Sequence, residues 1–228
     1  MAWGLLFPLL GMDHAGIGST HVNLFFTCFN IPPINEKTLK KQESEIGPVV
    51  EQVAQESCKD AARSEAAQTN QSLGGIEISY DMGWQKRGRA INSLTGVGHG
   101  ISCKTNKVVA YGTRSKRCAT CYAAAKLNRE LTPHDCRKNV QKSSKAMEAD
   151  AAGDIAKQLL SNGVEITRMV GDDDSTAIKA LREQCSSFIE KSSDINHIKK
   201  NQGNRLYELK SAGHSELSNK VIEYVQKC

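Results

Sequence analysis

Four side chains that commonly bind metal lie close together in the sequence. Cys118 and Cys121 form a Cys-x-x-Cys pair, and His134 and Cys136 follow across a short loop. Two donors at this spacing, with two more across a loop, can form a tetrahedral zinc site with three thiolates and one imidazole. The alternative is a set of free cysteines in a flexible insert. A redox-active pair is disfavoured, because we do not expect this pair to open a helix that follows a strand.

Two aspartates are placed where predicted strands end. Asp81 follows Ile76–Tyr80, in which apolar and polar residues alternate, and Asp172 follows the predicted strand Val164–Val170. Carboxylates at the ends of neighbouring strands can meet at one edge of a sheet, where they repel each other unless a cation compensates. Such oxygen ligands suit Mg²⁺ or Mn²⁺, which support phosphodiester chemistry. The alternative is that these aspartates cap turns or helices, as the position of Asp174 indicates for that residue.

Asp194 and His197 follow the last predicted strand with an Asp-x-x-His spacing. The histidine could bind metal, contact a scissile phosphate or orient another side chain. A single histidine is also a common structural residue, so the spacing leaves both interpretations open.

The formal net charge of +5 is unevenly distributed along the chain. Residues 1–85 have a net charge of −5, residues 86–145 of +12 and residues 146–228 of −2. So basic a middle segment predicts a polyanionic partner, most simply nucleic acid, although a solvated basic face is the alternative. The candidate DNA-binding residues in it are Lys86, Arg87, Arg89, Arg114, Lys116, Arg117, Arg137 and Lys138.

Length and composition limit the class of protein. The chain has 228 residues, of which 39% are hydrophobic and 5% aromatic. This length predicts one domain with an appendage, or two small domains. No apolar stretch approaches the roughly 20 residues of a membrane-spanning helix, which excludes an integral membrane protein. The apolar N-terminal stretch has no Lys or Arg before it, and five of the eight cysteines are scattered, so we expect an intracellular chain without a secretory signal.

Residues 1–74 are predicted to form a helical N-terminal region and a linker. Helices are expected over Val22–Phe29 and over Glu36–Ile46, the second capped by Asn35. Pro48 is expected to break that second helix, because proline lacks the amide donor, and a third helix follows it. A helix-turn-helix is the alternative, but the second helix lacks a clear recognition face.

Residues 75–228 are predicted to form an α/β core with a cysteine-rich insert at about residues 114–142. The expected order is three strands, a helix, a strand, a helix, a strand and two closing helices. A meander that passes into crossover helices predicts a mixed sheet with helices packed on it. The other predicted elements are a glycine-punctuated strand over 96–100, strand Val108–Tyr111, a helix containing Met147 and Leu159 that ends at Gly163, a helix from Ser175 and strand Phe188–Ile189.

Several of these segments together resemble the Mutator-like transposase domains of animal genomes, a group akin to Kolobok-type DNA transposons. The resemblance covers nearly the whole chain, and its motifs are specific as a set. They are Ser79–Gly88, Asn92–Gly96, Thr105–Val109, the cysteine insert with Cys118, Cys121, His134 and Cys136, the SSKAME segment Ser143–Glu148, Val170–Ser175 and Asp194–His197.

The resemblance implies a ribonuclease H-like fold and DDE-type transposase chemistry on DNA with Mg²⁺ or Mn²⁺. Asp81 would be the first metal-binding carboxylate and Asp172 the second, with Asp174 as the competitor for the second role. His197, in the family's Asp-x-x-His element with Asp194, would lie near the scissile phosphate. The expected partners are transposon-end DNA and, in a homo-oligomer, a second copy of the chain, and the DNA substrate implies a nuclear location.

One departure from the family pattern concerns the third acidic residue of a DDE site. It is expected beyond the Asp-x-x-His element, yet the chain ends 31 residues after His197. Glu208, Glu216 and Glu223 remain, and we expect them to be solvated helix residues. The resemblance therefore implies a truncated transposase that is inactive alone. The alternatives are a non-catalytic, zinc-stabilised DNA-binding module or a protein-interaction domain.

Overall fold

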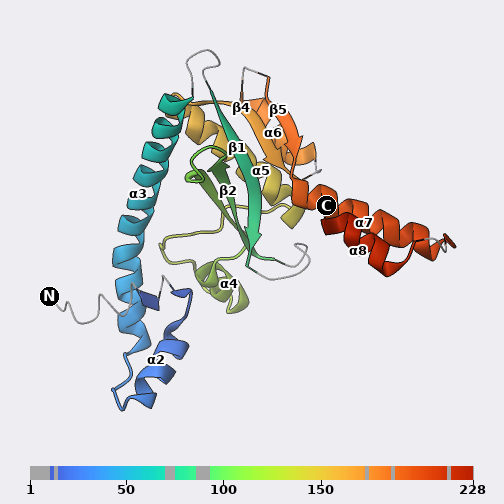
Figure 1. Cartoon of the computed structure of the whole chain (residues 1–228). Coiled ribbons are helices and arrows are strands. Elements are labelled where there is room, and N and C mark those ends of the chain that lie inside the picture. The colour runs from blue at the N-terminus through green and yellow to red at the C-terminus, as the bar shows by residue number, and fades with distance from the viewer. Residues whose placement is uncertain are drawn as a thin grey trace. The chain divides into compact units, whose positions relative to one another are not determined.

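The computed structural model describes residues 11–12, 15–69, 75–85, 93–172, 175–185, 188–214 and 217–227 (Figure 1). The chain divides into two compact units, Met1–Glu56 and Ser57–Cys228. Within the described ranges, none of the helices has the length and apolar character needed to cross a membrane.

The first unit contains helix α2 (Ser19–Cys28) and the start of helix α3 (Glu36–Gln68). Both helices begin where the sequence predicts them within a few residues. Asn35 caps α3 as predicted, because its side-chain oxygen accepts a hydrogen bond from the Lys37 N–H at 2.9 Å. A small apolar core consists of Met12, Val22 and Leu39.

The predicted break at Pro48 is wrong, because α3, which is 33 residues long, continues through this proline. Proline removes the N–H that would bond the carbonyl of Ser44, four residues earlier. Both residues are exposed, so water can satisfy that carbonyl. Gly47, Val49 and Val50 beside the proline are poor helix formers, but the helix as a whole is rich in Glu, Lys, Gln and Ala, which compensate for the lost bond.

The second unit is built on a five-stranded mixed sheet of order β3-β2-β1-β4-β5. Strands β1, β2 and β3 form the predicted antiparallel meander, and β1, β4 and β5 are mutually parallel, with crossover helices between them. The strands are β1 (Gly75–Trp84), β2 (Thr95–Ser102), β3 (Val108–Ser115), β4 (Glu165–Gly171) and β5 (Glu190–Ser193).

The topology sends four strands in one direction. Two antiparallel steps make β3 run in the same direction as β1, and β4 and β5 are parallel to β1. The carboxyl ends of these four strands therefore lie at one edge of the sheet, which we call the carboxyl edge. The segments that follow them, which include the cysteine insert and the Asp-x-x-His element, start from this edge.

Helix α5 (Ser144–Ser161) packs on one face of the sheet, and helix α6 (Ser175–Gln184) packs beside α5. Alternate residues of β1, including Ile78 and Tyr80, are buried on this face. Gly98 of β2 permits the close approach of α5, since a Cβ there would lie 2.9 Å from the Cβ of Ala151.

The ends of α5 follow the sequence signals. The Ser143 side chain caps the helix by accepting a hydrogen bond from the Ala146 N–H at 3.3 Å. Gly163 follows the helix with a φ of +74°, which glycine adopts without strain. Trp84 of β1 packs against a small cluster of buried residues that includes Met82 and Val140.

Two elements differ from the prediction. Helix α4 (Ala119–Lys126) was predicted as loop; it is rich in alanine and buries no side chain, so no amphipathic pattern marks it. The last strand is Glu190–Ser193, two residues beyond the predicted Phe188–Ile189. Its sequence is polar and it lies at the edge of the sheet, whereas the buried Ile189 precedes it.

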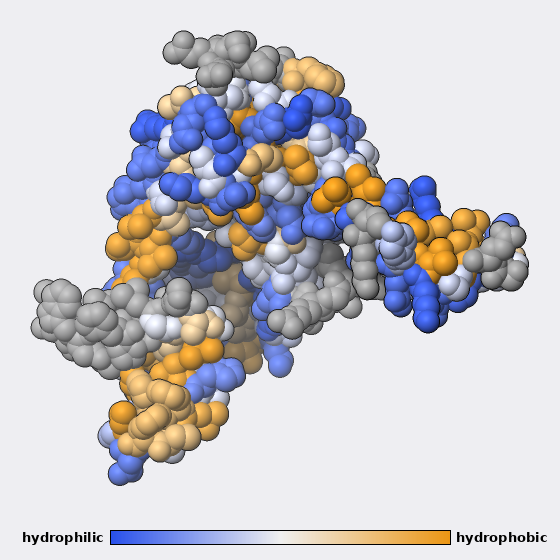
Figure 2. Space-filling view, viewed as in Figure 1, coloured by the Kyte–Doolittle hydropathy of each residue, from blue (hydrophilic) through white to orange (hydrophobic). Residues whose placement is uncertain are grey.

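The two predicted closing helices are α7 (Ile195–Ser211) and α8 (Asn219–Lys227). They pack against each other, and the Ile222 side chain of α8 is fully buried. Apolar side chains such as Leu209 and Val221 remain at the surface of this pair, which Figure 2 shows as a mixed apolar and polar patch.

Candidate functional site

The four side chains of the cysteine insert converge on one point. Their ligand atoms all lie within 4.8 Å of one another. His134 Nε2 is 3.2 Å from Cys118 Sγ and 3.3 Å from Cys121 Sγ, and the sulfurs of Cys121 and Cys136 are 3.6 Å apart. The segment between residues 121 and 134, made of the rest of α4 and the loop that follows it, thus brings the second pair of donors onto the first, as the spacing predicts.

These distances fit a zinc ion at the centre of the cluster. Zn–S bonds of about 2.3 Å and Zn–N bonds of about 2.0 Å in a tetrahedron place neighbouring donors about 3.6–3.8 Å apart. The observed distances of 3.2–3.6 Å are close to these values. His134 Nδ1 also lies 2.8 Å from the carbonyl oxygen of Thr132, which leaves Nε2 to face the sulfurs. The cluster is therefore compatible with structural zinc.

The contacts within the cluster change the pKa values of its members in opposite directions. Hydrogen bonding from the backbone of Cys121 lowers the pKa of the Cys118 thiol to about 6. Hydrogen bonding with Cys136 raises the pKa of the Cys121 thiol to about 11. The carbonyl of Thr132 raises the pKa of His134 to about 9. Without a metal, Cys121 and His134 thus hold protons near pH 7 that zinc binding would displace.

The Cys-x-x-Cys pair opens a helix, contrary to the prediction. Cys118 is the N-cap residue of α4, three residues after β3 ends, so the Cys-x-x-Cys pair does open a helix that follows a strand. What favours metal over redox chemistry is instead the position of His134 and Cys136, whose ligand atoms lie in the same cluster.

Asp81 and Asp172 occupy equivalent positions on adjacent parallel strands. The β1–β4 register pairs Ser79 with Val170, and each aspartate lies two residues further along its own strand direction. Residues two apart in a strand point to the same face, so the two carboxylates share the face of Ser79 and Val170, which is opposite α5. Both residues are exposed, and Asp81 accepts a hydrogen bond from the Met82 N–H at 2.8 Å. Asp81 lies inside β1, three residues before its end, and not at the end as predicted.

Asp194 extends this pair to a third strand. The β4–β5 register pairs Gly171 with Ser193, so the next residues along, Asp172 and Asp194, are also aligned. The Asp194 N–H donates to the Gly171 carbonyl at 3.0 Å, which continues the ladder. Asp81, Asp172 and Asp194 therefore form one row at the carboxyl edge, which we call the aspartate row.

A second row on the same face supports this alignment. Four residues before the aspartate row, the register aligns Glu77, Arg168 and Glu190 on β1, β4 and β5. Arg168 forms ion pairs with both neighbours, at 3.2 Å to Glu77 and 3.0 Å to Glu190. Cross-strand contacts of this kind require the three side chains to lie on one face. The aspartates, an even number of residues further on, share that face.

His197 joins two members of the aspartate row. It lies in the first turn of α7, where its Nδ1 contacts the Asp172 carboxylate and is 3.7 Å from Oδ2 of Asp194. Asp194 is the N-cap of α7, and its side chain accepts a hydrogen bond from the Asn196 N–H at 2.8 Å. The start of α7 thus positions the Asp-x-x-His element against the end of β4.

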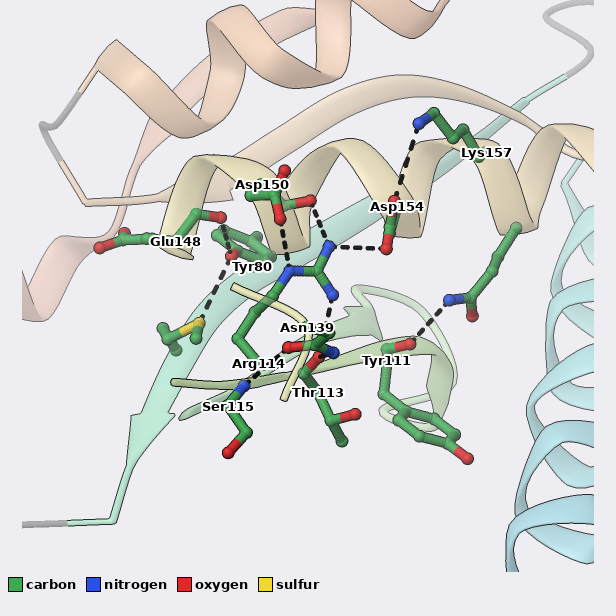
Figure 3. A network of polar contacts seen from close by, with 12 residues as sticks. Tyr80, Tyr111, Thr113, Arg114, Ser115, Asn139, Glu148, Asp150, Asp154 and Lys157 are labelled. Carbon is green, nitrogen blue, oxygen red and sulfur yellow. Dashed lines mark hydrogen bonds and ion pairs between the residues drawn. The ribbon is translucent and has the colours of Figure 1, made fainter. Parts of the chain in front are cut away.

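Arg114 is not an exposed DNA-binding residue, which corrects the prediction. Its side chain is only 7% exposed and contacts α5 (Figure 3). Nε is 2.7 Å from a carboxylate oxygen of Asp150, and Nη2 is 2.6 Å from one of Asp154. Nearby, the Tyr80 hydroxyl donates to the Glu148 carbonyl at 2.6 Å, and burial raises the pKa of this tyrosine. Both contacts fix α5 to the sheet.

The other predicted basic residues differ in their surroundings. Lys116 donates to the Ser144 hydroxyl at 2.8 Å and is half-buried. Arg117 is exposed, with its guanidinium 4.7 Å from the ring centre of Tyr122. Arg137 pairs with Asp135 at 2.7 Å, and both are exposed. Lys138 is exposed as well, whereas Lys86, Arg87, Arg89 and Asp174 lie outside the described residues.

The late glutamates behave as predicted where they are described. Glu208 on α7 and Glu223 on α8 are exposed helix residues, and Glu216 lies outside the described ranges. The sequence did not predict the alignment of Asp194 with the other aspartates. A correct position for the last strand would have predicted it, because Asp194 directly follows the observed strand Glu190–Ser193.

The fold and its polar clusters define an α/β protein with a Cys/His cluster that could bind metal and an aspartate row, both of which start from the carboxyl edge of one mixed sheet. A family model described as Mutator-like transposase matches residues 8–228, and the chain belongs to this family. No curated protein and no solved structure matches the chain.

Proposed function

We propose that this chain is a DDE-type transposase domain that cleaves DNA with Mg²⁺ or Mn²⁺ bound at the aspartate row. The observation that carries the proposal is the alignment of Asp81, Asp172 and Asp194 on three adjacent strands in a member of a transposase family. The antiparallel meander followed by two parallel strands supports the ribonuclease H-like fold that the family resemblance implies. The Kolobok-like placement rests on the sequence motifs alone.

The donor chemistry of the row fits a hard divalent cation. Its members offer carboxylate oxygens, which Mg²⁺ and Mn²⁺ prefer, and three like charges in one row are stabilised by a cation. Asp81 and Asp172 would hold the ion, and Asp194 is the candidate for the third carboxylate. The ion would activate the attacking oxygen and stabilise the leaving oxygen at the scissile phosphate.

His197 positions the second carboxylate in this proposal. Its imidazole contacts Asp172 and lies close to Asp194, so it restricts both side chains before DNA binds. Restricting a ligand in this way lowers the entropic cost of assembling the site. Its position at the start of α7, whose backbone N–H groups carry partial positive charge, also favours an anionic phosphate nearby.

Exposed cations of the cysteine insert would contact the DNA backbone. Arg117 and Lys138 are exposed, and the insert starts from the same edge of the sheet as the aspartate row. Zinc bound by the cysteine cluster would fix the shape of this basic segment. A DNA substrate in turn implies a nuclear location, and action at two transposon ends would require a homo-oligomer.

The test is nicking of an end-labelled DNA duplex in Mn²⁺ by the full chain. We expect Asp81→Asn to abolish nicking while the affinity for the duplex changes little, because the exchange removes a metal ligand and no basic group. Glu77→Gln is the matched control, since Glu77 lies on the same strand and face, four residues away. Equal nicking by wild type and Asp81→Asn would overturn the proposal.

The role of Asp194 has its own variant. Asp194→Asn removes the charge but keeps an oxygen that can cap α7. If Asp194 is the third carboxylate, this variant loses nicking and keeps its thermal stability. Nicking that survives Asp194→Asn but not Asp81→Asn would assign the third carboxylate to another residue.

A non-catalytic, zinc-stabilised DNA-binding module is the second candidate function. The observation that favours it is that the zinc ligands converge within one short segment that also carries exposed cations. This function gives DNA binding that weakens steeply as salt rises, because counterions are released on binding. It gives no nicking by wild type or by any aspartate variant.

A further inference from the structure

His99 lies beside the aspartate row, on the side that Asp172 does not occupy. The antiparallel β1–β2 register pairs Asp81 with His99, and the β2–β3 register pairs His99 with Tyr111. Residues directly opposite each other on adjacent strands have Cβ atoms about 4.5–5.5 Å apart. His99 is therefore the cross-strand neighbour of the first carboxylate of the proposed site.

The glycines around His99 show which way its side chain points. Gly98 and Gly100 are buried on the face that packs on α5, where a Cβ on Gly98 would lie 3.0 Å from the Tyr80 hydroxyl. Because successive residues of a strand point to opposite faces, His99 points to the other face. That is the face of Asp81, which alternates with the buried Tyr80 and Met82.

No structural contact accounts for the imidazole of His99. Within the described part of the chain, it takes part in no hydrogen bond and no ion pair, although the residue is partly buried. Its ring nitrogens are therefore not committed to the fold and are available to a ligand. By contrast, His197 contacts Asp172 and His134 faces two sulfurs.

We propose that His99 donates an N–H to a phosphate oxygen of the DNA strand bound at the aspartate row. The inference rests on the proposed function, because it places the strand at Asp81. A histidine ring carries at least one N–H in either charge state, so the contact needs no particular protonation. A hard cation at Asp81 prefers oxygen ligands, and the neighbouring imidazole is therefore left to bind the phosphate.

The first experiment observes the ring directly. Histidine side chains are labelled with ¹³C, and their ring signals are recorded by NMR as a DNA duplex is added to the full chain in Ca²⁺. The His99 signal is assigned by its loss in His99→Ala. We expect this signal to move with the bound fraction of DNA, while the exposed His214, beyond the far end of α7, does not move. A His99 signal that stays in place at saturating DNA overturns the inference, as does a chain that binds no DNA.

The second experiment measures nicking in Mn²⁺. His99→Ala is expected to slow nicking about tenfold, the size of one lost hydrogen bond to a charged group. His99→Gln keeps an N–H donor and should recover part of that loss. Ile101→Ala is the matched control, because Ile101 lies two residues further along the same strand and face. Equal losses for Ile101→Ala and His99→Ala would indicate a packing effect and overturn the inference.

The two experiments separate the inference from the proposed function. A moving His99 signal with nicking that is absent or insensitive to Asp81→Asn retains the phosphate contact and rejects DDE chemistry. Nicking that requires Asp81 but ignores His99, with an unmoved His99 signal, retains the chemistry and rejects the contact.

Discussion

The cysteine cluster and the aspartate row start from the same edge of one sheet but are assembled in different ways. The cysteine cluster takes all its ligands from 19 consecutive residues, Cys118–Cys136. The aspartate row takes its members from three strands, and Asp81 and Asp194 are 113 residues apart in the sequence. The donor atoms of the cluster already lie within 4.8 Å of one another, whereas within the described ranges no such group forms from the aspartates.

The difference shows what each site needs from the rest of the molecule. A short loop determines the position of the cysteine ligands, and zinc binding can supply the energy that orders it. The aspartate row depends on strand register, so it exists only when β1, β4 and β5 are paired. Changes in the sheet should therefore affect the row and leave the cluster intact, and changes in the insert should do the reverse.

The largest expected effect is a loss of nicking in a variant that keeps its zinc. Asp172→Asn should leave one zinc per chain and lower Mn²⁺-dependent nicking by about a thousandfold, because a catalytic ion contributes several kcal/mol of charge stabilisation. Cys121→Ser should lose the zinc. Zinc content is measured by atomic emission on the purified chain. Loss of zinc in Asp172→Asn would contradict the independence of the two sites.

A change in the sheet should be next in size. Gly98→Ala places a Cβ 2.9 Å from that of Ala151 and should lower the free energy of unfolding by about 3 kcal/mol. Gly112→Ala is the matched control, since its nearest atom, the Ala151 carbonyl oxygen, is 3.4 Å away and an ordinary contact results. Urea denaturation measures both, and equal losses would show that α5 does not approach β2 as closely as described.

Removing Arg114 should have a smaller effect on stability. Arg114→Met leaves Asp150 without its counter-charge and Asp154 with only Lys157, 3.8 Å away, but these carboxylates are 45% and 42% exposed. We therefore expect a loss of about 2 kcal/mol, below that of a fully buried ion pair. Arg137→Met, which breaks the exposed pair with Asp135, should change stability by less than about 0.5 kcal/mol.

Arg114→Met also tests whether Arg114 contacts DNA. Arg114→Met should leave the salt dependence of DNA binding unchanged, because the side chain is buried. A reduced dependence on salt for Arg114→Met would show that Arg114 reaches the phosphate backbone after all.

The smallest expected effect concerns the thiols of the metal-free chain. At pH 7, Cys118 is mainly thiolate because its pKa is lowered to about 6, and Cys121 is mainly thiol because its pKa is raised to about 11. Iodoacetamide should therefore alkylate Cys118 at least about tenfold faster than Cys121. The alkylation rate of Cys118 should fall as the pH drops below 6, where this thiol is protonated. Peptide mass spectrometry measures both sites, and zinc should protect both.

The sequence predicted the elements that carry strong local signals. The alternation in β1, the glycine that ends α5, and the order of strands and helices all follow from residue type and spacing. It failed where local signals conflict with context. Pro48 does not end α3, because exposed backbone can be solvated, and the polar β5 was missed, because an edge strand pairs on only one side.

By itself, the sequence determined the cysteine cluster, since four ligands within one loop can meet under local constraints alone. Tertiary structure decided which residues belong to the second site. Strand register, which depends on pairing across more than a hundred residues, aligned Asp194 with Asp81 and Asp172 and placed His99 next to Asp81. It also buried Arg114 against α5, because a charged side chain leaves the solvent only when the fold supplies two carboxylates to pair with it.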